Sequence, residues 1–126
     1  MHRNTLTLAL GAMTLLLLVP AAASADGDVA AGKATFTTLC VSCHGVGGKG
    51  DGPVGAMLQP APRDFTKAEF KFDTDKDGTA GTDADLKAVI SQGAMAFGGS
   101  PLMAPNPSLS EADIANVIAF VRSLKE

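Results

Sequence analysis

The stretch Cys40-Val41-Ser42-Cys43-His44 contains both cysteines of the 126-residue chain and one of its two histidines. Three kinds of structure use a C-x-x-C pair: a redox dithiol, a disulfide and half of a zinc site. A redox dithiol belongs in a βαβ context, which this sequence does not indicate, and zinc needs four ligands. The stretch supplies three, and the only other histidine is at the N-terminal end of the chain. These three interpretations therefore fit less well than a fourth.

The fourth interpretation follows from the imidazole directly after the second cysteine, because C-x-x-C-H is the attachment sequence for a c-type haem. Each thiol can reach one vinyl group of the same porphyrin, so Cys40 and Cys43 would form the two thioethers. His44 would then lie beneath the iron as its proximal ligand. We predict a single covalent haem c at this site.

Haem iron in an electron carrier usually has a second axial ligand, and the candidates here are methionines, because no further histidine follows the N-terminal segment. Without such a ligand the iron would be open. The candidates are Met57, Met95 and Met103. Met103 lies in a Gly- and Pro-rich stretch over residues 93–110, which can fold over the open face of the haem opposite His44. We predict Met103 as the distal ligand, with Met95 as the alternative and Met57 as a packing residue near the haem edge.

Apolar periodicity predicts three helices, over residues 28–39, 82–91 and 110–124, and no strand of useful length. The last helix begins with a capping box of Ser110 and Asp113. Short helices joined by long loops leave a thin core for a domain of ~100 residues. A buried macrocycle would supply the missing apolar interior. The predicted fold class is therefore all-α, with short helices and long loops wrapped around one haem.

Residues 1–25 have the order of a secretory signal peptide: a basic start, an unbroken apolar run over residues 6–19, and small residues at the end. We predict cleavage after Ala25, with cleavage after Ala23 as the alternative, and one domain over residues 26–126. The apolar run is shorter than the ~20 residues of a spanning helix, so an uncleaved anchor is less favoured. The protein is expected to be periplasmic or otherwise exported, and to have no membrane span after cleavage.

The charge balance is acidic. Without Arg3, nine Lys and Arg face thirteen Asp and Glu, a formal charge of −4 before the haem propionates are counted. Binding to nucleic acid needs a basic face that neutralises phosphates, so this balance argues against it. Protein partners with positive patches are expected instead.

In these features the sequence resembles the class I monohaem cytochromes c over essentially all of residues 26–126. The haem motif is the most specific likeness, and Gly32 and Phe36 before it, Gly45 after it and Phe120 near the C-terminus follow the family's order. The resemblance implies the cytochrome c fold, in which the N- and C-terminal helices cross in contact. Gly32 would permit the close approach, and Phe36 and Phe120 would pack near the crossing.

Residues 50–72 contain short segments similar to those of a subgroup that includes small periplasmic carriers and haem domains of larger oxidoreductases. The sequence departs from the family in two respects. Ala104 follows the loop methionine where the family usually has Pro, and the chain has no Trp or Tyr to donate hydrogen bonds to the propionates. Arg63, Lys71 or backbone groups are therefore the candidates for that role.

Two other patterns are set aside. Residues 73–78 match the first half of a calcium-binding EF loop, but the twelfth position is Ala84 where a bidentate Glu is needed. We predict a solvated acidic turn and no calcium site. Residues 47–49 faintly resemble a phosphate-binding loop, but Gly50 follows Lys49 in place of Ser or Thr.

These observations predict outer-sphere electron transfer, in which the iron alternates between ferric and ferrous and no substrate bond is broken, so the chain is not expected to be an enzyme. Transient redox partner proteins would meet the haem edge near the cysteines. Two alternatives stay open: a haem subunit of a larger exported oxidoreductase, and an open-site haem enzyme or gas sensor. The latter would need polar groups on the open face, where Arg63, Lys67 and Lys71 are the candidates.

Overall fold

The structure, a computed structural model, describes residues 26–126; the expected signal peptide, Met1, Met13 and His2 lie outside this range. The described part is all-helical and contains no strand. Its four α-helices and three short 3-10 helices are, in chain order, α1 (Val29–Leu39), α2 (Val41–His44), η1 (Gly55–Met57), η2 (Phe65–Lys67), α3 (Asp83–Gln92), η3 (Ala94–Phe97) and α4 (Glu111–Ser123). The all-α prediction is confirmed.

The first helix begins where its sequence supplies a cap. Asp28 has extended backbone angles, and its carboxylate accepts a hydrogen bond from Ala31 N at 2.8 Å, which satisfies one of the free amides of the first turn. The helix ends at Cys40, whose amide donates to Phe36 O. A separate short helix, α2, follows and carries Cys43 and His44.

Helices α3 and α4 both begin with a complete capping box. In α4 the Ser110 hydroxyl accepts from Asp113 N while the Asp113 carboxylate accepts from Ser110 N, as the sequence predicts. Thr82 and Asp85 make the same reciprocal pair at the start of α3. α3 stops at Gly93, which has a positive φ of 80° that glycine adopts without strain.

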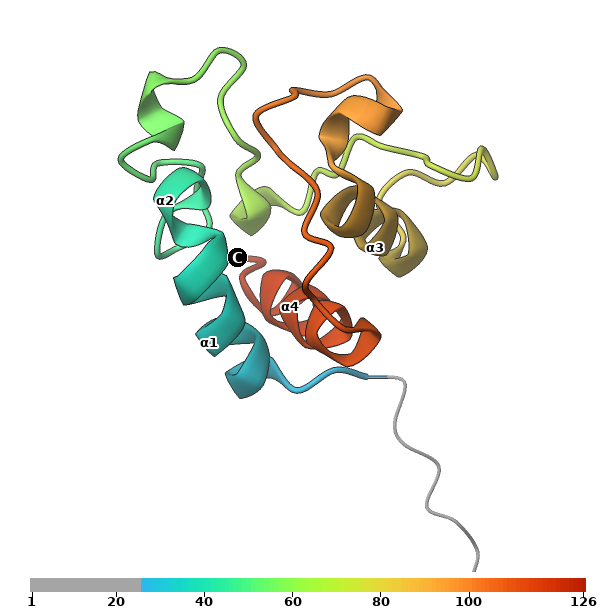
Figure 1. Ribbon diagram of the computed structural model, residues 1–126, viewed down its shortest axis with the longest axis horizontal. Helices are drawn as coiled ribbons and strands as arrows, with labels where there is room; N and C mark the ends of the chain where they lie inside the picture. The colour runs from blue at the N-terminus through green and yellow to red at the C-terminus, as the bar shows by residue number, and fades with distance from the viewer. Residues whose placement is uncertain (1–25) are drawn as a thin grey trace, which may run out of the picture.

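The core forms where α1 crosses α4, on one side of the molecule (Figure 1). A Cβ atom on Gly32 would overlap the carbonyl group of Asn116, so only glycine allows the two backbones to approach this closely. Beside the crossing the rings of Phe36 and Phe120 lie 5.1 Å apart, a separation typical of aromatic pairs. Both roles agree with those that the family resemblance implies.

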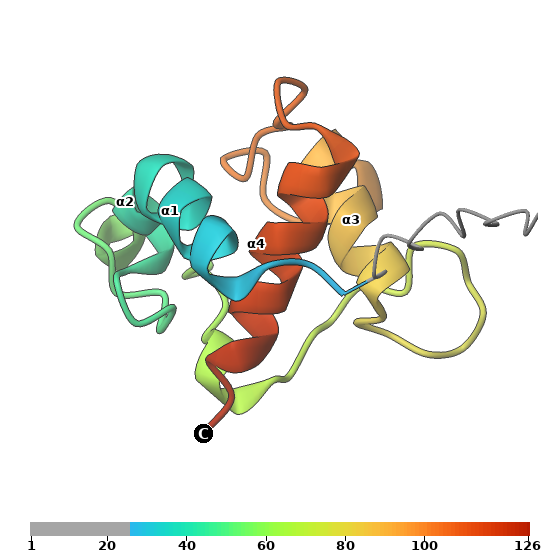
Figure 2. The ribbon, with the colours of Figure 1, turned by 90° about the horizontal axis from the view of Figure 1, so that it is seen from below.

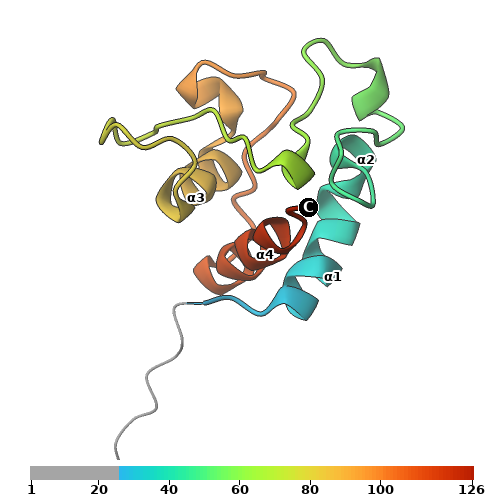
Figure 3. The same cartoon turned by 180° about the vertical axis from the view of Figure 1, so that it is seen from behind.

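Helix α4 lies between α1 and α3 in all three views (Figures 1, 2 and 3). Its inward stripe is almost fully buried and consists of Ile114, Val117, Ile118, Phe120 and Val121. The 3-10 helix η1 contacts α2 and η3 contacts α3, so these two turns lie at opposite sides of the molecule (Figure 3). Within residues 26–126 no helix is long and apolar enough to cross a membrane.

The close contact at Gly32 predicts that a side chain there lowers the stability of the protein. Gly32→Val should lower the free energy of unfolding of the holoprotein by about 2 kcal/mol or more, because the side chain would have to push two packed helices apart. Gly47→Val is the matched control, since a Cβ atom there meets only the Lys49 side chain, at 3.9 Å. Denaturant unfolding of both variants measures the difference. Equal stability of the two variants would show that the helices do not touch at Gly32.

Candidate haem site

Residues of α1, α2, α3 and α4 line a cavity of about 530 Å³. Its volume lies within the ~300–1,000 Å³ range of cofactor and ligand pockets. Among the apolar side chains that line it are Phe36, Leu39, Leu58, Phe65, Phe70, Phe72, Leu86, Val89, Ile90, Leu102, Val117, Ile118 and Val121. Such walls suit a flat apolar group better than a water-filled channel.

Cys40, Cys43 and His44 all line this cavity. The turn that joins them is helical, with His44 N donating to Cys40 O at 2.9 Å, so the two thiols and the imidazole are held together. The two cysteines form no disulfide with each other, and burial, followed by the charge of Cys43, raises the pKa of the Cys40 thiol to about 11. A protonated, half-buried thiol has little in common with a redox-active dithiol, which needs a lowered pKa.

The glycine-rich segment after the motif folds back onto the motif's own backbone. Gly50 N donates to His44 O at 2.8 Å, and Gly52 N donates to Cys43 O at 3.2 Å. A Cβ atom on Gly52 would overlap the carbonyl groups of Val41 and Ser42. This close approach explains why the loop is rich in glycine, and the two hydrogen bonds hold the loop against the motif.

The imidazole of His44 lies against Phe65, with ring centroids 4.6 Å apart and planes 18° from parallel. Burial lowers the pKa of His44, and the nearby backbone of Arg63 partly opposes this shift. His44 Nδ1 is buried and has no hydrogen-bond partner among residues 26–126. A neutral, buried imidazole is the form that binds a metal, so the environment suits an iron ligand.

Phe65 is a site residue that the sequence did not single out. Asp64 caps η2 by accepting from Thr66 N at 3.0 Å and from Thr66 Oγ1 at 2.6 Å, and the Thr66 hydroxyl is the main cause of the lowered pKa of Asp64. Phe65 N donates to Gly48 O at 2.8 Å, which ties η2 to the loop after the motif. The Asp-x-Thr cap was a visible signal for this turn.

Met103 lines the cavity, on a loop that is fixed at two points. Met103 O accepts from Ala94 N at 3.0 Å, and Asn106 N donates to Ile90 O at 3.1 Å. Met95 does not line the cavity and is 68% exposed. The structure thus brings Met103 to the same cavity as His44 and leaves Met95 at the surface.

Met57 differs from expectation. Its side chain is 77% exposed and does not line the cavity, so the prediction of a packing residue near the haem edge was wrong. It lies on η1, a single 3-10 turn at the surface whose only buried residue is Gly55. Arg63 and Lys71, the two candidates for the propionates, both line the cavity.

The acidic residues after Phe72 form a hydrogen-bonded turn. Asp77 N and Gly78 N donate to the carboxylate of Asp73, at 3.1 and 2.9 Å. Asp73, Asp75 and Asp85 each have a carboxylate oxygen within 4.8 Å of the others. The oxygens of Asp85, however, already accept hydrogen bonds from threonines.

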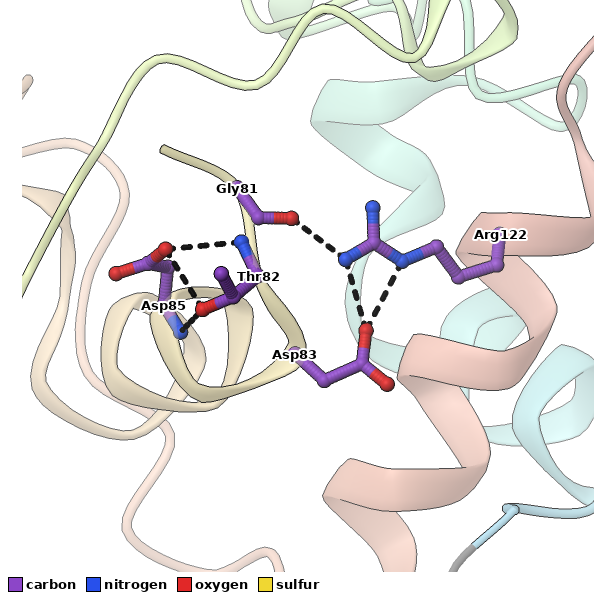
Figure 4. A network of polar contacts seen from close by, with 5 residues as sticks. All are labelled: Gly81, Thr82, Asp83, Asp85 and Arg122. Carbon is purple, nitrogen blue, oxygen red and sulfur yellow. Dashed lines mark hydrogen bonds and ion pairs between the residues drawn. The ribbon is translucent and has the colours of Figure 1, made fainter. Parts of the chain in front are cut away.

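A polar network joins the start of α3 to the end of α4 (Figure 4). Arg122 donates from Nε and Nη2 to Asp83 Oδ1, at 3.0 and 2.8 Å, and from Nη2 to Gly81 O at 2.6 Å. Its guanidinium also lies 4.8 Å from the ring centroid of Phe70, a wall residue of the cavity. The network therefore holds one wall of the cavity against α4.

Comparison with known proteins agrees with this geometry. Residues 29–125 match the sequence profile of the family described as cytochrome c. The chain is 37% identical over 102 residues to cytochrome c-554(547) of Halothiobacillus neapolitanus, covering 79% of this chain and 99% of that protein.

A solved structure is also similar. A chain of the reducing HAO-like protein complex of Kuenenia stuttgartiensis matches with a TM-score of 0.64 and 33% identity over 78% of this chain. The match spans 43% of that longer chain. Two thiols, an imidazole and a thioether around one apolar cavity fit a covalent haem, and the sequence match covers almost all of residues 26–126. The chain belongs to the cytochrome c family and binds haem c covalently.

Proposed function

We propose that the chain carries single electrons through its haem, with Cys40 and Cys43 as the thioether residues, His44 as the proximal ligand and Met103 as the distal ligand. The observation that carries the proposal is that all four side chains line one cavity. Electron transfer is the function of the family to which the chain belongs, and the haem supplies the one-electron ferric–ferrous couple.

The side chains of this protein have three tasks in that function. The apolar walls exclude water from the cofactor, and the two thioethers would prevent its loss during repeated encounters with partners. His44 and Met103 would fill both axial positions, and a methionine ligand favours a higher reduction potential than a second imidazole. With no axial position free for a substrate or a gas, we propose a carrier rather than an enzyme or a sensor.

Partners would meet the protein where the cavity reaches the surface. Leu39 and Leu102 line the cavity and are nevertheless 47% and 62% exposed, so the cavity mouth has an apolar rim. A small apolar contact of this kind suits brief encounters, in which electrons pass without a permanent complex. Arg63 and Lys71, at the same cavity, would bind the propionates.

A second candidate is a permanent haem subunit of a larger redox complex. It is favoured by the similarity to a chain of the Kuenenia stuttgartiensis complex, and by the same exposed rim at Leu39 and Leu102, which a stable partner could cover. Both roles use the same electron-transfer chemistry and differ in how long the partner stays bound.

The distal ligand is tested by optical spectra of the haem-loaded protein. Ferric wild type should have a weak sulfur-ligation band near ~700 nm, and Met103→Ala should lose it, lower the reduction potential and bind carbon monoxide when reduced. Met95→Ala is the matched control and should keep the band. If the wild-type protein is high-spin and binds carbon monoxide readily, the proposal of a carrier is wrong and the chain is an open-site haem protein.

Purification of the natural protein from the cells that produce it tests how long the partner stays bound. A free carrier should elute from size exclusion as a monomer in physiological salt, with all of its haem absorbance in that one fraction. Co-elution of most of the haem with a larger protein through several columns would favour the subunit role.

Export is tested by the mass of the natural protein. We propose that residues 1–25 are removed, so the mature chain should begin at Asp26, carry one haem and occur in the periplasmic or extracellular fraction. Intact-mass measurement after fractionation gives both results. A full-length mass in the membrane fraction would contradict cleavage and indicate an anchor.

A further inference from the structure

Asp85 is an unusual residue for a cavity wall. It lies in the first turn of α3 and is 1% exposed, and among residues 26–126 it and Phe36 are the largest side chains that are fully buried. It also belongs to the residues that line the cavity containing His44 and Met103. Acidic side chains are rarely buried unless a cation or several hydrogen bonds compensate them.

Neutral donors compensate Asp85. Its Oδ1 accepts from Thr74 N and Thr74 Oγ1, at 2.6 and 2.8 Å, and its Oδ2 accepts from Thr82 N and Thr82 Oγ1, both at 2.8 Å. The bonds to Thr82 are visible in Figure 4, where Arg122 pairs with the neighbouring Asp83. Among residues 26–126 no Lys or Arg forms a salt bridge with Asp85.

The hydrogen bonds keep the carboxylate ionised despite its burial. The bonds from Thr74, the backbone amide first, and those from Thr82 outweigh the cost of desolvation and hold the pKa of Asp85 far below its ordinary value. At neutral pH Asp85 therefore places a fixed, fully buried negative charge in the wall of the cavity.

Helix capping alone does not explain this arrangement. Asp113 has the same position in the capping box of α4, with its own pair of bonds to Ser110, yet it is only half-buried and does not line the cavity. Asp85 differs in having a second pair of donors, which Thr74 supplies from eleven residues away. Capping of α3 needs only the bonds to Thr82. The bonds from Thr74 therefore have a further effect, which is to stabilise a negative charge in the cavity wall.

We propose that Asp85 is a potential-setting residue: its buried negative charge favours the ferric over the ferrous haem and lowers the reduction potential. Reduction adds one electron to the iron, and a negative charge nearby in a medium of low dielectric constant opposes that addition. The inference rests on the haem occupying the cavity, as proposed above. Arg63, Asp64 and Lys71 also line the cavity. Arg63 and Lys71 are exposed, so solvent screens their charges, and the half-buried Asp64 is paired with Lys67 at 4.0 Å.

Potentiometric titration of the haem-loaded protein at pH 7 tests this inference. Asp85→Asn removes the charge and keeps the shape, and it should raise the midpoint potential, giving a severalfold higher ferrous-to-ferric ratio at the wild-type midpoint. Asp113→Asn, the matched control, should leave the midpoint unchanged. The shift should persist in high salt, because a buried charge is poorly screened.

A second variant, Thr74→Val, should shift the midpoint potential in the opposite direction. Thr74→Val removes one donor and leaves the charge, so the less compensated carboxylate should lower the midpoint potential. A purely structural role for Asp85 would not give shifts of opposite sign. If Asp85→Asn does not fold, Thr74→Val decides the question.

The inference is overturned if Asp85→Asn leaves the midpoint unchanged or lowers it while the band near ~700 nm is preserved. It is also overturned if Thr74→Val fails to lower the midpoint. Failure of the proposed axial ligation would appear separately, as the absence of that band in the wild-type protein.

Discussion

The contact between the backbones of α1 and α4, at Gly32 and Asn116, is the constraint on which the rest of the structure depends. Because α2 follows α1 after a single residue, the direction of α1 determines where the two thiols and the imidazole lie. α4 in turn presents one apolar stripe to α1 and to the cavity. One glycine without a side chain thus fixes the reactive motif relative to the opposite wall.

The apolar interior is divided between two roles. The cluster around Phe36 and Phe120 is already buried by protein contacts, although Phe36 also reaches the cavity. Leu86, Val89 and Ile90 of α3 are only partly buried and face a cavity that the protein does not fill. The apolar area of α3 is therefore buried fully only when a cofactor is present. Since anything that binds the folded state alone stabilises it, folding of this domain and retention of the haem are energetically coupled.

The sequence predicted what local patterns determine. Capping residues and apolar periodicity located α1, α3 and α4 within a few residues, and the spacing of the motif indicated the cofactor. It could not predict which loop side chains turn inward, and the expectation for Met57 was wrong for that reason. The stacking of Phe65 on His44 and the pairing of Asp85 with Thr74 join residues 21 and 11 positions apart, and no local pattern encodes such contacts.

The protonated thiol of Cys40 has a consequence for the chain before haem attachment. Disulfide formation starts from a thiolate, and with a pKa of about 11 only a very small fraction of Cys40 is ionised near neutral pH. In an oxidising compartment two cysteines this close in sequence can close into a ring and lose the ability to form thioethers. Burial makes Cys40 a poor attacking thiolate in that reaction, and once the thioethers have formed neither sulfur can take part in it.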